Sequence, residues 1–168
     1  YQKDKKLPFY INFETINIHG AKPFFREIKQ IDEDLHLAMD LDLWIKFILI
    51  NNLHSVQKLD SIIVNFRLHS NSKTVNNNEQ MVIERATLLQ EVINSIHLQK
   101  GKYINYLKKL NEPNKEEIIK GCIDFQLYWY RYFKKRKSVS ADKLFELISQ
   151  NNIGVKENIK NLFPFLFT

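Results

Sequence analysis

The strongest constraint on the fold is the apolar run DLDLWIKFILI at residues 40–50. Its apolar side chains point in nearly all directions around a helix of about three turns, so such a helix must be buried on most sides. Asp40 would lie at or near the N-terminus of this helix, where a carboxylate is favoured. The sequence therefore predicts a helix that other elements cover.

The rest of the chain predicts a mainly α fold with a small β component, that is, an α+β class. Residues 8–18 are rich in aromatic and β-branched residues and predict extended structure, and residues 54–69 predict two short strands, the second with alternating side chains. The polar stretch at 70–78 has no hydrophobic period and marks a boundary. After it, apolar spacing predicts four helices: a long helix stopped by Gly101, one over 102–111, one opened by Pro113, and one starting at Ser140.

Composition excludes several classes of protein. The chain of 168 residues is 44% hydrophobic, enough for a folded core, and no run approaches the ~18 uncharged apolar residues that a membrane span needs. Its four scattered glycines cannot form a P-loop or a G-x-G-x-x-G motif. The single Cys122 excludes an internal disulfide and a cysteine zinc cluster. This usage fits a reducing compartment, and we expect the cytoplasm.

Charge is concentrated in the second half of the chain. Residues 1–84 carry 10 Lys or Arg and 11 Asp or Glu, which gives a net charge of −1. Residues 85–168 carry 15 Lys or Arg and 8 Asp or Glu, which gives a net charge of +7. The positive charge of residues 85–168 has two interpretations: solvated lysines on ordinary helices, or peripheral contact with the inner face of an anionic membrane. No nucleic-acid-binding motif is present, so we expect no nucleic-acid partner.

Two acidic residues in the apolar run are the first candidates for chemistry. On a helix, Asp40 and Asp42 point about 200° apart, so they cannot chelate one metal ion together. Asp40 fits two interpretations, an N-cap or a general base that takes a proton from an acceptor hydroxyl. The sequence leaves both open at this point.

Two further candidates come from later in the chain. Arg67 and His69 share one face of an alternating strand, where a guanidinium can hold phosphate and an imidazole can bind a metal; a surface-facing strand edge is the plainer interpretation. The cluster LYWYRYFKKRK at 127–137 interleaves aromatic and basic residues. It fits a lipid interface or stacked bases, and it also fits a core helix with a basic end.

Taken together, IDEDLHLAMDLDLWIKF at 31–47 and FRLHSNSKT at 66–74 resemble a known pattern. They are similar to the second, acceptor-side half of bacterial family 2 glycosyltransferases with the GT-A fold, which carry "fDE-L--a-DyDLWlRl" and then "fR-H--S-T". The close match covers residues 24–74. The resemblance implies an incomplete GT-A acceptor-side half over 1–75, followed by a helical C-terminal extension over 76–168.

The same resemblance implies an activity and its residues. The enzyme would transfer a sugar from a nucleotide-diphosphate donor to a hydroxyl of a glycan or lipid-linked acceptor, with inversion at the anomeric carbon. The reaction would belong to the synthesis of surface polysaccharide or another glycan. Asp40 matches the catalytic base of the family. Asp42 and Trp44 match residues that bind the acceptor. His69 matches the histidine near a divalent metal, Mg²⁺ or Mn²⁺, with Arg67 as a diphosphate contact.

This sequence also departs from the family pattern. Lys46 replaces the usual arginine after DLW, which keeps the charge but loses the planar fork. The family's nucleotide-binding half lies upstream of the motif, whereas only 39 residues precede Asp40. We therefore expect a fragment that is inactive alone and that self-associates as a homodimer through uncovered apolar surface. The alternative function is a non-catalytic helical module for interaction or membrane docking.

Overall fold

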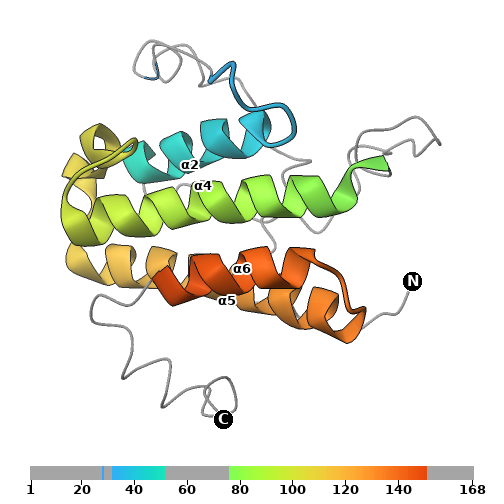
Figure 1. Ribbon diagram of the computed structural model, residues 1–168. Coiled ribbons are helices and arrows are strands. Elements are labelled where there is room, and N and C mark those ends of the chain that lie inside the picture. The colour runs from blue at the N-terminus through green and yellow to red at the C-terminus, as the bar shows by residue number, and fades with distance from the viewer. Residues whose placement is uncertain (1–27, 29–31, 52–75, 151–168) are drawn as a thin grey trace, which may run out of the picture.

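The computed structural model describes Ile28, residues 32–51 and residues 76–150. Their elements are α2 (Met39–Asn51), α4 (Asn78–Leu98), the 3-10 helix η4 (Ile104–Lys109), α5 (Glu112–Lys135) and α6 (Ser140–Gln150). Helix α4 lies in the middle of the described part, with α2 on one side and the antiparallel pair α5 and α6 on the other (Figure 1). No helix within the described ranges is long and apolar enough to cross a membrane.

The α+β fold class is wrong for this part of the chain. Residues 32–51 and 76–150 form helices and turns and contain no β-strand, so an incomplete GT-A acceptor-side half is not supported. The physical reason lies in what α2 contacts: among the described residues, its apolar side packs on η4 and α4. The segments expected as strands, at 8–18 and 54–69, lie outside the described residues.

The predicted buried helix is confirmed as α2. Ile45, Ile48 and Leu49 are buried on it, and its first turn is acidic. Asp40 is the second residue of this helix, and its carboxylate accepts a hydrogen bond from the N–H of Leu41 at 2.8 Å. The helix begins one residue earlier than the apolar run.

The helices after residue 76 largely follow their sequence signals. Helix α4 ends just before Gln99, which adopts a left-handed φ of 51°, and Gly101 follows with φ 106°. Helix α5 opens at Asn111, whose side chain accepts the N–H of Asn114 at 3.0 Å, with Pro113 in its first turn. The helix expected over 102–111 is the shorter η4.

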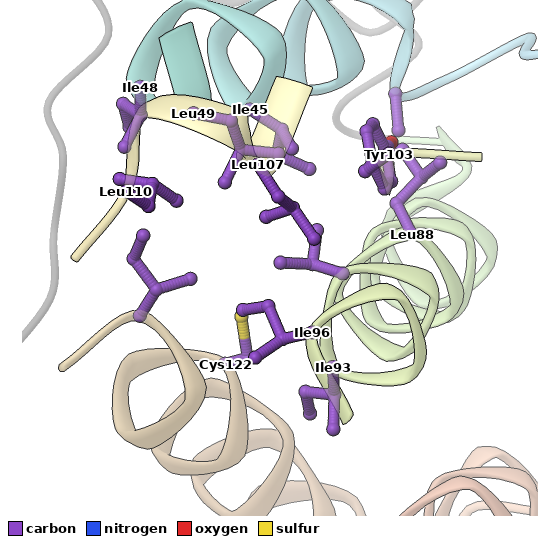
Figure 2. Packing of buried hydrophobic residues seen from close by; sticks show 13 residues of the cluster. Ile45, Ile48, Leu49, Leu88, Ile93, Ile96, Tyr103, Leu107, Leu110 and Cys122 are labelled. Atoms are coloured by element: carbon purple, nitrogen blue, oxygen red, sulfur yellow. The ribbon is translucent and has the colours of Figure 1, made fainter. Parts of the chain in front are cut away.

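A continuous hydrophobic core joins α2 to the later helices. Figure 2 shows Ile45 and Leu49 of α2 facing Leu107 of η4, with α4 and α5 closing the same cluster. The core therefore crosses the predicted boundary between residues 75 and 76. Its buried members are Ala38, Ile45, Ile48, Leu49, Leu88, Val92, Ile93, Ile96, Tyr103, Leu107, Leu110, Ile118 and Cys122.

A second cluster fixes α5 and α6 against α4. It is built on Leu127, Phe133 and Leu144, each at most 2% exposed. Between α4 and α5, the buried amide of Gln126 donates to the carbonyl of Ala86 at 3.2 Å and to Oε1 of Gln90 at 3.1 Å. Buried amides need such partners, so this pair sets the register of the two helices.

Candidate functional site

The N-terminal end of α2 carries the candidate base in an accessible position. Asp40 is exposed, as is the preceding Met39, which is 50% exposed. The first turn of a helix presents the positive end of the helix dipole, which favours the ionised carboxylate. Asp40 is therefore accessible from solvent, as a base that takes a proton from a substrate hydroxyl must be.

Asp42 lies on the other side of the helix and is buried. Its Oδ2 pairs with Nζ of Lys46 at 2.6 Å, and its Oδ1 pairs with Nζ of Lys102 at 2.9 Å. The hydroxyl of Tyr103 donates to the same Oδ1 at 2.7 Å. With 1% of its side chain exposed, Asp42 is occupied by protein groups in this arrangement.

The ion pairs continue to the segment before α2. Nζ of Lys102 also lies 2.5 Å from Oδ2 of Asp32, so one ammonium bridges two carboxylates. Lys102 and Tyr103 follow α4, whereas Asp32 precedes α2. We call Asp32, Asp42, Lys46, Lys102 and Tyr103 the Asp42 network. It joins three separate segments of the chain at one point.

The charges of the Asp42 network reinforce one another. Burial by itself raises the pKa of Asp42, but the hydrogen bonds from Lys46, Tyr103 and Lys102 outweigh it, and the pKa falls below its ordinary value. Burial likewise opposes the charge of Lys102, but Asp32 and Asp42 raise its pKa overall. Burial and the adjacent Asp42 raise the pKa of Tyr103, so its hydroxyl stays protonated and donates.

A second contact fixes the backbone that leads into α2. Oε1 of Glu84, on α4, accepts the N–H groups of Leu37 at 3.0 Å and of Ala38 at 3.1 Å. Helix N-termini leave such donors without intrahelical partners, and a carboxylate satisfies them well. The start of α2 is thus held by Glu84 as well as by the Asp42 network.

Trp44 lies one turn after Asp40, on the same side of α2. It is half-buried, and its ring meets the edge of Phe47 with centroids 6.2 Å apart at 79°. Helical spacing therefore puts Asp40 and Trp44 on one side of α2 and Asp42 on the opposite side. An acceptor-binding role for Asp42 stays a prediction, although its carboxylate faces the protein interior.

The donor-side candidates fall outside the described residues. Arg67 and His69 both lie in the segment 52–75. Within the ranges that are described, no group of three or more His, Cys, Asp or Glu side chains could hold a metal ion. The metal and diphosphate roles of these two residues stay predictions.

Sequence patterns did not point to Glu84, Lys102 or Tyr103. Each reaches its partner across a long stretch of chain; the Tyr103–Asp42 contact, for example, joins residues 61 positions apart. One part of the network carries a local signal, since Asp42 and Lys46 stand four residues apart on one helix. A scan against protein-family models, and searches of curated proteins and solved structures, find no match to this chain.

Proposed function

We propose that this chain is part of an inverting glycosyltransferase, with Asp40 as the general base. One observation carries the proposal: an exposed carboxylate lies on the first turn of a helix whose start is fixed by a partly buried ion-pair network. A base works well when it is accessible to the acceptor and rigidly oriented toward it. The motif around Asp40 and Asp42 supplies the reaction class.

Each residue at the start of α2 would have a distinct part. Asp40 would accept the proton of the acceptor hydroxyl. The oxygen of that hydroxyl would attack the anomeric carbon of the donor sugar while the nucleoside diphosphate leaves. Trp44 would offer a partly exposed apolar surface beside the acceptor. Asp42 would act as a positioning residue, because its contacts with Lys46 and Lys102 hold the helix and not the substrate.

The leaving diphosphate needs positive charge on the donor side. In this proposal Arg67 contacts the diphosphate and His69 lies at a divalent metal, which would neutralise the departing charge. Both roles rest on the motif FRLHSNSKT alone. Binding of the nucleotide itself would need residues other than those described here.

The decisive experiment is sugar transfer by the protein expressed from its complete reading frame. Release of nucleoside diphosphate would be followed with a panel of nucleotide sugars and Mg²⁺ or Mn²⁺. Asp40→Asn should lower kcat about 10²–10⁴-fold, the usual contribution of a general base. Circular dichroism should show an unchanged helical fold, because Asp40 is exposed.

Asp34→Asn is the matched control, since Asp34 is also an exposed aspartate near the start of α2. It should leave kcat within about twofold. Retained transfer by Asp40→Asn would exclude Asp40 as the base. Absence of transfer with every donor by the unsubstituted protein would count against the reaction class itself.

A further inference from the structure

The turn between α5 and α6 concentrates positive charge at one end of the described helices. Lys134, Lys135, Arg136 and Lys137 are consecutive and exposed, and Val139 follows them. We call these five residues the basic tip. Its backbone is well defined: Lys137 has φ 54°, its N–H donates to Lys134 O at 3.1 Å, and that of Ser138 donates to Phe133 O at 3.1 Å. The cations are thus presented by an ordered turn.

One carboxylate reaches the turn that carries the basic tip: that of Glu79 accepts hydrogen bonds from the hydroxyls of Ser138 and Ser140 at 2.6 Å, and it pairs with no cation of the tip. None of the four cations forms an ion pair within the described part of the chain. Residues 131–143 hold six Lys or Arg and a single acid, Asp142. Like charges this close repel one another, and an anionic surface would relieve that repulsion.

Exposed apolar side chains accompany these cations. Five large hydrophobic residues in the described ranges are exposed, and three of them belong to α5, α6 and the turn between them: Tyr128 at 42%, Val139 at 73% and Phe145 at 45%. The ring of Phe145 lies 5.9 Å from that of Tyr130, over which Nζ of Lys134 sits at 5.3 Å. Apolar and cationic groups therefore share this end of the hairpin.

Two aromatic rings of α5, those of Trp129 and Tyr132, are poorly placed to stack on nucleobases. The guanidinium of Arg136 lies 3.6 Å from the centroid of Tyr132, which occupies that ring face. The ring of Trp129 is surrounded by Phe125, Tyr128, Tyr132 and Phe133. Stacking needs an open ring face, whereas anionic headgroups need only cations beside apolar groups that enter the interface.

We propose that the basic tip docks on an anionic phospholipid surface, with Val139 entering the headgroup region and the four cations contacting lipid phosphates and carboxylates. Charge complementarity selects the anionic surface, and the exposed Val139 selects lipid over a soluble polyanion. This surface is separate from Asp40, so it does not depend on the proposed sugar transfer.

Vesicle flotation tests the electrostatic part. The 168-residue chain should bind vesicles containing phosphatidylserine, bind weakly to pure phosphatidylcholine, and lose binding between about 0.05 and 0.5 M salt. Lys135→Gln with Arg136→Gln should lower the partition coefficient about 30-fold, since each basic residue near the surface contributes about fivefold. The control pair Lys100→Gln with Lys120→Gln removes two exposed lysines elsewhere and should have less than a threefold effect.

Site-specific labelling tests the placement. Cys122 is buried, and burial raises its pKa to about 12, so it does not react with a thiol dye in the folded chain. An environment-sensitive dye on Val139→Cys should shift its emission to the blue on phosphatidylserine vesicles. The same dye on Thr87→Cys, an exposed site on α4, should not shift.

Four results would overturn the proposal. One is absence of binding to phosphatidylserine vesicles at low salt. Another is equal loss of binding in the Lys135/Arg136 and Lys100/Lys120 pairs, which would indicate net charge without a specific surface. The third is binding to vesicles without a response of the dye at position 139. The fourth is tighter binding to an oligonucleotide than to vesicles.

Discussion

At the scale of single residues, Asp42 shows how burial and charge are reconciled. A carboxylate taken out of water costs several kcal/mol unless cations and hydrogen-bond donors replace the lost solvent. Lys46, Lys102 and the hydroxyl of Tyr103 supply these replacements. The local consequence is a fixed first turn of α2, and with it a fixed backbone at Asp40.

Tyr103→Phe should remove about 1.5–3 kcal/mol from the free energy of unfolding at pH 7, the usual contribution of a hydrogen bond to a charged group. The folded-state pKa of Asp42 is depressed, so its stabilisation is present above the ordinary value of 3.8 and is lost as pH falls through the depressed value. The difference in unfolding free energy between the unsubstituted chain and Tyr103→Phe should therefore become smaller below about pH 4. Urea titrations at pH 7 and pH 3 measure both quantities.

Tyr106→Phe provides the control for this prediction. Tyr106 lies in the same 3-10 helix, and its hydroxyl has no hydrogen-bond partner among the described residues. Its loss should change stability by less than about 0.5 kcal/mol. Equal effects of the two substitutions would mean that the Tyr103–Asp42 hydrogen bond adds nothing to stability.

At the scale of elements, the end of α5 shows a helix stop built without glycine. The two backbone hydrogen bonds from Lys137 and Ser138 form a Schellman motif, which needs a left-handed residue at the position of Lys137. Glycine is usual there because it has no Cβ to clash. A lysine at this point is less stable than glycine but adds a cation to the basic tip.

Lys137→Gly should therefore raise the free energy of unfolding by about 0.5–1 kcal/mol, because it relieves the left-handed conformation. Lys120→Gly is the matched control: it removes the same charge from an exposed residue inside α5, and should lower stability by about 0.5–1 kcal/mol. Thermal unfolding followed by circular dichroism measures both. The same sign of change in both variants would contradict the left-handed strain at Lys137.

At the scale of the whole molecule, one core connects α2 to the helices after residue 76. Leu49 of α2 and Cys122 of α5 belong to the same buried cluster, although the sequence suggested a boundary between their segments. Helices that share a core unfold together when most of their apolar area lies in that core. Cys122 offers a native probe of this cooperativity.

Leu49→Ala should destabilise the fold by about 2–5 kcal/mol, as expected for a fully buried leucine. If α2 and α5 unfold as one unit, the rate at which a thiol reagent labels Cys122 at pH 8 should rise. The rise should equal the factor by which Leu49→Ala increases the unfolding equilibrium constant. The control Thr87→Ala changes an exposed residue and should leave the labelling rate nearly unchanged. An unchanged rate in Leu49→Ala would mean that α2 opens independently of the other helices.

Much of the local structure follows from the sequence alone. The apolar run at 40–50 requires a buried helix, and Pro113 and the polar stretch before residue 78 mark where α5 and α4 begin. These signals suffice because hydrophobic period and capping chemistry act over a few neighbouring residues. The accessible place of Asp40 beside Trp44 also follows from helical spacing.

Only the tertiary structure decided what each helix face meets. The incomplete GT-A half expected over residues 1–75 is not supported: among the described residues, η4 and α4 pack on the apolar side of α2, and Asp42 faces Lys102 and Tyr103 and not solvent. Contacts across some sixty residues leave no local pattern, because many pairings of apolar faces satisfy the same periodicity. The sequence by itself thus determined where the helices of the described residues lie, and packing determined that Asp42 pairs with Lys46, Lys102 and Tyr103 and that the cations of the basic tip remain exposed.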